Sequence, residues 1–176
     1  MRYALVDTAI GLFGIGWTDS GLARVALPGR DREQTIEWIS RDGAEADVPG
    51  VALADLPERI RRYAEGARDE FADVPLDLSG VPAFHRQAYA ELLKVGYGVT
   101  TTYGAIARTL GDVALSRAVG QAMGQNPIPL VIPCHRVLGA DGKTGGFSSP
   151  GGVTAKMQML ALEHAASPTG QYAFGF

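Results

Sequence analysis

The chain has 176 residues, of which 46% are hydrophobic and 20% charged, a composition typical of a soluble globular protein with one domain or two small ones. Its single cysteine, Cys134, excludes an internal disulfide and a multi-cysteine zinc site and indicates a reducing compartment. No apolar run is long enough to span a bilayer, and no signal-peptide pattern begins the chain, so we expect a cytoplasmic protein.

The net charge of −3 conceals an asymmetry between the two halves of the chain. Residues 1–80 hold nine Lys and Arg against fifteen Asp and Glu, whereas residues 81–176 hold seven against four. If the protein binds DNA, the second half should do so, with modest non-specific affinity.

The chain begins with three short apolar segments, 2–8, 11–18 and 21–27, separated by Gly, Asp and Ser. This pattern predicts an antiparallel meander joined by tight turns. Asp31 is expected to cap a helix that ends near 42–43. Its apolar side would carry Ile36, Trp38 and Ile39.

A loop is expected at 44–52, followed by a helix from Leu56 to about Ala67. Its apolar residues recur at helical spacing, at Leu56, Ile60, Tyr63 and Ala64. Val74 to Leu78 is expected to form one more strand. We therefore predict a structural α/β domain over 1–78, a linker over 79–82 and a second domain over 83–176.

The second domain is predicted to be mostly helical. A helix should run from Ala83 to Gly96, and Val99 to Thr102 should be extended. The inward face of that helix would be Phe84, Ala88, Leu92 and Leu93. Two short helices, 102–110 and about 114–123, flank a glycine-containing turn at 111–113, the pattern of a helix-turn-helix.

The second of these helices has small residues at alternate positions and one cation, Arg117. Such a low surface either packs closely against the protein's own core or lies in a narrow DNA groove, with Arg117 reaching between bases. The pattern alone leaves both interpretations open.

Cys134 follows a short apolar run, 130–132, and lies in a segment with prolines at 127, 129 and 133. Proline restricts its own backbone and that of the preceding residue, so this segment should be stiff and non-helical. A lone cysteine is usually a small buried hydrophobe. The adjacent His135 and Arg136 instead favour a reactive thiolate.

After the cysteine, 139–143 is expected to be a hairpin tip and 147–152 a glycine-rich loop. A last helix should begin near Val153. Its inward residues would be Met157, Leu160 and Ala161, with Glu163 and His164 near its end.

Four separated motifs of the second half together resemble one known family, the O6-alkylguanine-DNA alkyltransferases, also called methylated-DNA–protein-cysteine methyltransferases. The motifs are Thr101-Thr102-Tyr103-Gly104, Arg117-Ala118-Val119-Gly120, Asn126-Pro127 and Ile132-Pro133-Cys134-His135-Arg136-Val137. The resemblance covers roughly 81–164. It implies an RNase-H-like α/β domain followed by a helical domain with a winged-helix-like helix-turn-helix.

The resemblance also implies the chemistry: Cys134 takes the alkyl carbon from guanine O6 in a single turnover. His135 would be the base, acting through a bound water, and Glu163 would orient its imidazole. Tyr103 would donate to guanine N3, and Asn126 would brace the turn that holds the cysteine loop.

For the substrate, the resemblance implies that Val137, Phe147 and Ser148 line the guanine pocket. The carbonyls of Cys134 and Val137 would accept from the guanine amino group, and the Ser148 N–H would donate to O6. Many family members have tyrosine where Phe147 stands, and the loop after Ser148 is longer here by about two residues, which bears on the choice of alkyl group. Lys156 matches a family lysine to which we assign no role.

For DNA, the resemblance implies contact with the minor groove of a duplex, with Arg117 filling the space of the flipped nucleotide. The further DNA contacts would be Thr102, Ser116, Ala118, Gly120 and Arg136. We expect a monomer that needs no cofactor or metal and binds no membrane.

Three alternatives were weighed. A non-enzymatic sensor of alkylated DNA would lack the cysteine, which this chain has. A cysteine hydrolase usually has its Cys and His distant in sequence. A transcription regulator would place Arg, Asn or Gln along its recognition helix, where this chain has mostly small residues.

Overall fold

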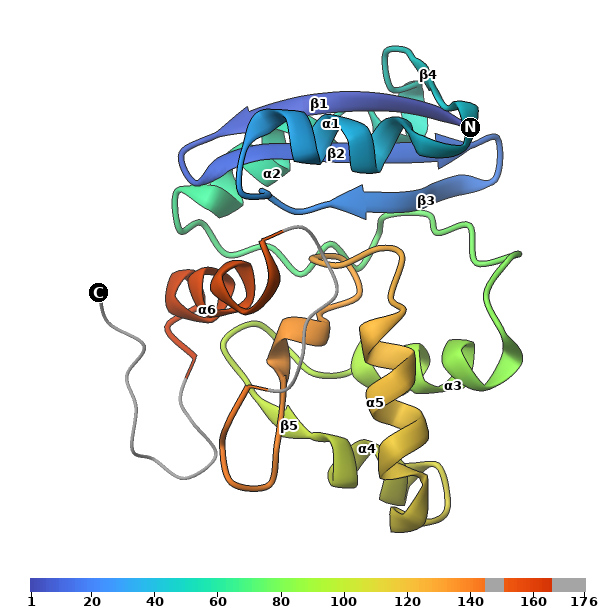
Figure 1. Cartoon of the computed structure of the whole chain (residues 1–176), viewed down its shortest axis with the longest axis vertical. Coiled ribbons are helices and arrows are strands. Elements are labelled where there is room, and N and C mark those ends of the chain that lie inside the picture. Colours follow the sequence, from blue (N-terminus) through green and yellow to red (C-terminus); the bar gives the residue numbers. More distant parts are fainter. Residues whose placement is uncertain (145–150, 166–176) are drawn as a thin grey trace.

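The computed structural model describes residues 1–144 and 151–165. A four-stranded sheet lies at one end of the molecule, and the helices of the second half gather beneath it (Figure 1). Its strand order is β3-β2-β1-β4, with β1 (Arg2–Thr8), β2 (Gly11–Thr18) and β3 (Gly21–Ala26) antiparallel. The predicted meander is therefore confirmed.

Strand β2 is buried on both of its faces, and its sequence explains how. Gly14 and Gly16 face helix α1 (Arg32–Ser40), and a Cβ on Gly14 would lie only 2.8 Å from Ile39. The alternate residues Phe13, Ile15 and Trp17 are large and buried in the main core. Small residues on one face thus let a helix approach closely, while large ones on the other build the core.

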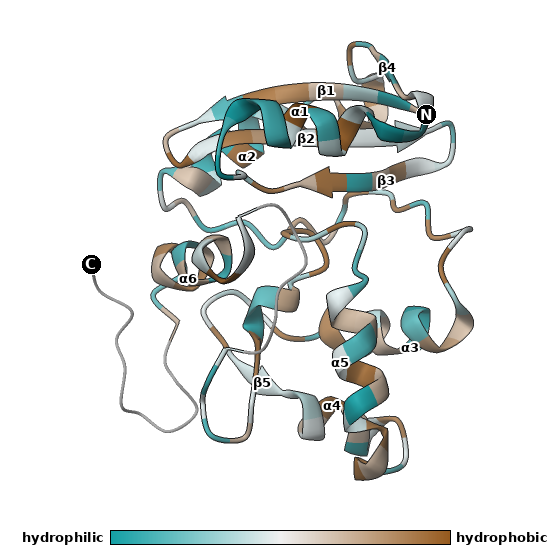
Figure 2. Ribbon diagram, in the orientation of Figure 1, coloured by the Kyte–Doolittle hydropathy of each residue, from teal (hydrophilic) through white to brown (hydrophobic). Residues whose placement is uncertain are grey.

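Helix α1 begins as predicted, because the Asp31 carboxylate accepts from the Gln34 N–H at 2.8 Å. It ends at Ser40 and passes into the 3-10 turn η1 (Arg41–Gly43). Figure 2 shows that this helix carries mainly hydrophilic residues, as its position on the outside of the sheet requires.

Helix α2 (Leu56–Ala64) follows the 3-10 turn η2 (Val51–Leu53) and lies behind the sheet in Figure 1. All four apolar residues predicted to face inward are buried there. The expected loop at 44–52 contains one short strand, β4 (Glu45–Ala46), which pairs in parallel with the start of β1.

The strand predicted at Val74 to Leu78 is wrong. Only one isolated bridge forms there, in which the Leu22 N–H donates to the Pro75 carbonyl and Leu22 accepts from Asp77. Pro75 has no N–H, and the Asp77 carboxylate accepts from the Ser79 N–H, so the backbone turns away after a single pair.

In the second half, α3 (Ala83–Leu92) ends before Gly96, and Phe84, Ala88 and Leu92 face the core as predicted. Leu93 is 43% exposed, whereas Tyr89 is buried and donates its hydroxyl hydrogen to the Ala122 carbonyl. The sequence did not indicate that Tyr89 faces inward, because its hydroxyl needs a partner in the interior and that partner lies 33 positions away on another helix.

The helix-turn-helix consists of α4 (Tyr103–Thr109), the 3-10 turn η3 (Val113–Leu115) and α5 (Ser116–Gly124). Strand β5 (Thr101–Thr102) leads into α4 and pairs in parallel with β6 (Val137–Leu138). The turn at 139–143 is closed by the Gly139 N–H on the Lys143 carbonyl. Residues 145–150, which include most of the glycine-rich loop expected at 147–152, lie outside the described residues.

The last helix, α6 (Gly152–Leu162), buries only part of the inward face that was predicted. Leu160 is buried as predicted, whereas Met157 and Ala161 are partly exposed. The other buried residues are Ala155, Lys156, Met159 and, just after the helix, Glu163. The sequence did not indicate the burial of Lys156, because lysines rarely lie in a protein interior.

Buried apolar residues from both halves form one contiguous cluster, from Val6 on β1 to Met159 on α6. The halves are also joined by a backbone hydrogen bond from Val25 to Pro127. The domain boundaries at 78 and 83 stay a prediction. In the described part of the chain, no helix is long and apolar enough to cross a membrane.

Gly21→Ala should destabilise the protein by about 2–4 kcal/mol, because it combines backbone strain with a clash. Gly21 has φ +145°, and an added Cβ would lie 2.6 Å from the Pro75 oxygen in the bridge to β3. Urea unfolding measures the loss.

The matched control is Gly43→Ala, since Gly43 has φ +71° but nothing within 4 Å of an added Cβ. Its free energy of unfolding should fall by only about 1 kcal/mol, the cost of holding an alanine in a left-handed backbone conformation. Equal losses in the two variants would contradict the close contact at Pro75.

Candidate active site

The segment before Cys134 is held by the side chain of Asn126. Its Nδ2 donates to the Ile132 carbonyl at 2.8 Å, and its Oδ1 accepts from the Ile128 N–H at 3.0 Å. Leu130 adopts φ +79° inside this turn. Cys134 then begins the 3-10 turn η4 (Cys134–Arg136). The predicted stiff segment therefore depends on one amide as well as on the prolines.

The Cys134 thiol is almost completely enclosed, at 3% exposure. Asn126 Nδ2 lies 3.1 Å from its sulfur. Burial raises the pKa of Cys134 to about 11, although the Asn126 hydrogen bond and the charge of Lys156 act in the opposite direction. The expectation that neighbouring charges maintain a thiolate is wrong for the free protein, because desolvation dominates.

His135 is completely buried, and its Nε2 lies 2.8 Å from Glu163 Oε1. An ionised carboxylate only accepts, so Nε2 carries the hydrogen and Nδ1 is an acceptor. Nδ1 has no hydrogen-bond partner among the described residues. Burial lowers the pKa of His135 despite the opposing effect of Glu163, so the ring is neutral and able to take a proton.

Glu163 follows α6 and is the most heavily bonded side chain of the site. Besides His135, its carboxylate accepts from Arg136 Nε at 2.9 Å, Arg136 Nη2 at 3.0 Å, the Gly98 N–H at 3.1 Å and the Tyr63 hydroxyl at 2.8 Å. Burial opposes its ionisation, but the hydrogen bonds from His135 and Arg136 outweigh that effect and hold the pKa of Glu163 well below its ordinary value.

Arg136 does not make the DNA contact predicted from the sequence. It is 3% exposed, and its guanidinium donates to Glu163 and to the Val95 carbonyl, the latter at 2.6 Å. A guanidinium enclosed in this way cannot reach a phosphate in the groove. The charge of Arg136 balances the buried Glu163 instead.

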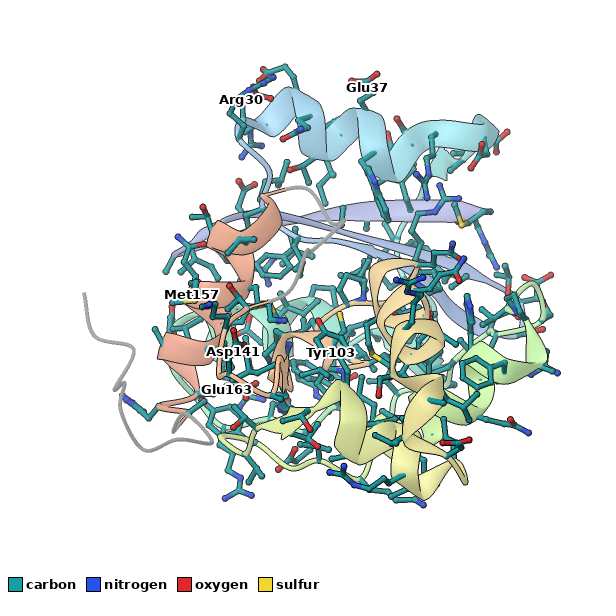
Figure 3. The ribbon with its side chains drawn as sticks, turned by 60° about the horizontal axis from the view of Figure 1, so that its bottom comes forward. Arg30, Glu37, Tyr103, Asp141, Met157 and Glu163 are labelled. Carbon is teal, nitrogen blue, oxygen red and sulfur yellow. The ribbon has the colours of Figure 1, made fainter. Side chains whose placement is uncertain are left out.

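Tyr103 and Glu163 both lie on the helical side of the molecule, far from Arg30, which precedes α1, and from Glu37 on α1 (Figure 3). Tyr103 begins α4 and is half-buried. Burial and the nearby Cys134 raise the pKa of Tyr103, so its hydroxyl is a donor at neutral pH. A Cβ on Gly120 of α5 would lie 3.8 Å from its ring, which places Tyr103 between the cysteine segment and α5.

The predicted DNA contacts on the helix-turn-helix differ in exposure. Arg117 is exposed and forms no ion pair within residues 1–144 and 151–165, whereas Ser116, Ala118 and Gly120 are half-buried. Thr102 caps α4 by accepting from the Ala105 N–H at 3.0 Å. Arg117 is thus the side chain of this set that projects fully from the surface.

Of the predicted substrate residues, only Val137 can be described. It is buried, and its carbonyl accepts from Lys156 Nζ at 2.6 Å. Phe147 and Ser148 lie outside the described residues.

Lys156 and Tyr63 are the members of the site that sequence reasoning missed. Burial lowers the pKa of Lys156 to about 8, against the opposing charge of Cys134. Lys156 had a signal, since it stands three, four and seven positions before Met159, Leu160 and Glu163 and so shares their helix face. Tyr63 had none, because it lies 100 positions from Glu163.

The described residues contain no group of three or more His, Cys, Asp or Glu that could hold a metal ion. What the site contains is a thiol, a neutral imidazole with a free acceptor nitrogen, and a buried carboxylate behind it. This set can deprotonate the thiol as it attacks an electrophilic carbon.

Comparison with known proteins identifies relatives of the whole chain. Residues 83–165 match the model of the 6-O-methylguanine DNA methyltransferase DNA-binding domain. A methylated-DNA–protein-cysteine methyltransferase of Mycolicibacterium paratuberculosis is 39% identical over 96% of this chain and 95% of its own.

Two solved structures extend the likeness to the fold. Mycobacterium tuberculosis OGT in complex with DNA superposes with a TM-score of 0.74 and 38% identity, covering 93% of this chain and 92% of that one. The O6-methylguanine-DNA methyltransferase of Pyrococcus kodakaraensis gives a TM-score of 0.73 and 28% identity, covering 92% of this chain and 99% of that one.

Glu163→Gln should destabilise the protein by about 3–5 kcal/mol at neutral pH, because it leaves the buried Arg136 guanidinium without its counter-charge. The pKa of Glu163 is depressed below its ordinary 4.5, so its charge adds stability above that pH. This contribution is lost as the pH falls below 4.5. The difference between the variant and the wild type should therefore shrink in acid, as measured by urea unfolding at a series of pH values.

The control is Glu58→Gln, which removes an exposed carboxylate that pairs with Arg61 at 3.0 Å. It should change the free energy of unfolding by about 0.5 kcal/mol or less. A Glu163→Gln loss of the same small size, or one independent of pH, would contradict the buried ion pair.

Proposed function

Because this chain belongs to the methylated-DNA–protein-cysteine methyltransferases, we propose that it repairs DNA by moving the alkyl group of O6-alkylguanine permanently onto its own Cys134. The observation that carries the proposal is that two neighbouring residues, Cys134 and His135, each have a fixed side-chain partner. Asn126 donates to the Cys134 sulfur, and the next residue, His135, is held by Glu163.

The transfer is a single displacement in which the bonds balance. The Cys134 sulfur attacks the alkyl carbon, an S–C bond forms, and the bond from that carbon to guanine O6 breaks. The thiol proton passes to His135 Nδ1 through a bound water. The electron pair stays on guanine, which Tyr103 stabilises as a leaving group by donating to N3.

A base is needed because the thiol is neutral before the reaction. With a pKa of about 11, Cys134 is ionised to only about one part in ten thousand at neutral pH. His135 is neutral and presents Nδ1 as an acceptor, so it can take the proton as the attack proceeds. Glu163 then stabilises the imidazolium that forms.

Two side chains favour negative charge on the sulfur as it loses its proton. The Asn126 amide donates to it directly, and Lys156 acts through its charge. Groups fixed before the reaction stabilise developing charge without having to reorganise. The product is a thioether, and a C–S single bond of this kind is not hydrolysed by water at neutral pH, so each molecule reacts once.

On the DNA side, we place α5 in the minor groove of the duplex. Cys134 is 3% exposed, so an alkyl group on a stacked base could not reach it, and the nucleotide has to be extruded. Arg117 would fill its place. Thr102, Ser116, Ala118 and Gly120 would lie along the sugar-phosphate backbone. Val137, Phe147 and Ser148 would line the guanine pocket, and Phe147 and the loop after Ser148 would set the range of alkyl groups.

The sheet with its helices and the helix-turn-helix are, on this proposal, an RNase-H-like domain and a winged-helix-like domain. The chain would act as a monomer in the cytoplasm without a cofactor. The alternative, a DNA-damage sensor without catalysis, is disfavoured because it has no use for a thiol next to a base.

Incubation with an oligonucleotide containing O6-methylguanine should add one methyl group per protein molecule, on Cys134. The adduct should form once and persist, because the thioether is stable. Intact mass spectrometry measures the stoichiometry, and peptide mapping locates the group.

Cys134→Ser is the control, since its hydroxyl is too weak a nucleophile to replace the thiol. No adduct on the wild type, or an adduct that persists in Cys134→Ser, would reject the transfer. Binding to methylated DNA without any adduct would support the sensor instead.

Arg117→Ala should slow the reaction with alkylated duplex DNA by about tenfold or more, because extrusion of the base costs a few kcal/mol that Arg117 helps to offset. The reaction with free O6-benzylguanine should change little, since that substrate needs no flipping. Single-turnover rates on the two substrates measure the difference.

Arg62→Ala, which removes an exposed charge on α2, controls for the loss of one positive charge. It should leave both rates nearly unchanged. Equal losses on both substrates in Arg117→Ala would remove the flipping role.

A further inference from the structure

A side chain of the first half takes part in the buried network behind the cysteine. Tyr63 lies on α2, is 1% exposed, and donates its hydroxyl hydrogen to Glu163 Oε1 at 2.8 Å. This is the same oxygen that faces His135 Nε2, also at 2.8 Å. Arg136 Nη2 donates to this oxygen as well, at 3.0 Å, so Tyr63, His135 and Arg136 together orient it.

A second contact from the first half reaches the same network. Glu70 accepts from the Tyr97 N–H and lies 3.4 Å from Arg136 Nη1. Arg136 in turn holds both oxygens of Glu163. The half that the sequence indicated to be structural therefore contacts both charged partners behind His135.

We propose that Tyr63 is a positioning residue for the alkyl transfer, which holds the Glu163 carboxylate in place and withdraws part of its negative charge from His135. This inference rests on the proposed role of His135 as the base. It goes further in making the first half of the chain part of the catalytic apparatus.

The physical effect of the Tyr63 hydroxyl is on the basicity of His135. A carboxylate that accepts an additional hydrogen bond carries less charge toward its other partners. Tyr63 keeps its proton, because burial and the neighbouring Glu163 raise the pKa of Tyr63 well above its ordinary value. Without that donor, Oε1 keeps Arg136 Nη2 but turns more of its negative charge toward the imidazole, which makes His135 a stronger base.

The other titratable and charged groups around the pair stay in place when Tyr63 is changed. Arg136 and Lys156 both act against protonation of His135. Cys134 is adjacent in the chain, Glu70 lies behind Arg136, and the Tyr97 hydroxyl donates to the Leu162 carbonyl at 3.0 Å. A shift of the pH profile that is seen in Tyr63→Phe alone therefore measures the effect of the hydrogen bond from Tyr63 to Glu163.

The experiment follows the pH dependence of the single-turnover rate with free O6-benzylguanine, which requires no DNA. The rate should fall in acid as His135 becomes protonated. This fall is the acid limb of the pH profile. In Tyr63→Phe its midpoint should move to higher pH by about half a pH unit to one pH unit, the size expected for one hydrogen bond among several. Below the midpoint the variant should be slower by about threefold to tenfold.

Tyr97→Phe is the matched control, because it removes a tyrosine hydroxyl from the backbone carbonyl just before Glu163 and leaves the carboxylate untouched. Its acid limb should coincide with that of the wild type, even where its unfolding midpoint is lower. An unshifted limb in Tyr63→Phe, or equal shifts in both variants, overturns the positioning role.

A second variant decides the question if Tyr63→Phe does not fold. A fluorinated tyrosine introduced at position 63 alone keeps the shape and donates a stronger hydrogen bond, so the acid limb should move downward. A limb that stays in place overturns the inference. A wild type that forms no adduct at all removes the proposed function and this inference together, whereas a reactive wild type with unshifted variants removes only the inference.

Discussion

The buried carboxylate of Glu163 is the constraint around which the site is organised. A charge removed from water has to be balanced by opposite charge and by hydrogen bonds, or the chain will not fold around it. Glu163, just after α6, has partners on three other segments: Tyr63 on α2, Gly98 before β5, and the pair His135 and Arg136 in η4. Satisfying one carboxylate thus brings both halves of the chain to the same point.

The same burial decides how the thiol reacts. An exposed cysteine beside two basic residues would carry a standing thiolate, open to oxidation and to other electrophiles. Here desolvation keeps Cys134 protonated. The Arg136 guanidinium is hydrogen-bonded to Glu163 and does not pair with the sulfur. On the proposed function, reactivity then depends on the imidazole accepting a proton while a substrate is in place. A protein that reacts once, as we propose, benefits from a nucleophile that stays protonated until a substrate is bound.

Two of the errors of prediction share a physical cause. On α6 the sequence did not indicate the burial of Lys156, a residue that usually lies in solvent, whose ammonium donates to the Val137 carbonyl. Arg136 was assigned to DNA from the family resemblance, but its guanidinium is buried against Glu163. In both cases a polar group finds its partner on a distant segment, and no local pattern indicates such a partner.

The sequence by itself determined the local parts of this protein. The three-stranded meander follows from its apolar segments and turn residues, the start of α1 from Asp31, and the family from four motifs around Cys134. These depend on neighbours within a few positions. The family resemblance implied that Glu163 orients His135, and the structure confirms that contact across 28 positions. Only the tertiary structure decided that Tyr63 reaches Glu163 across 100 positions and that the thiol is enclosed. Burial and ion pairing arise when distant segments pack together, and they set which groups are charged.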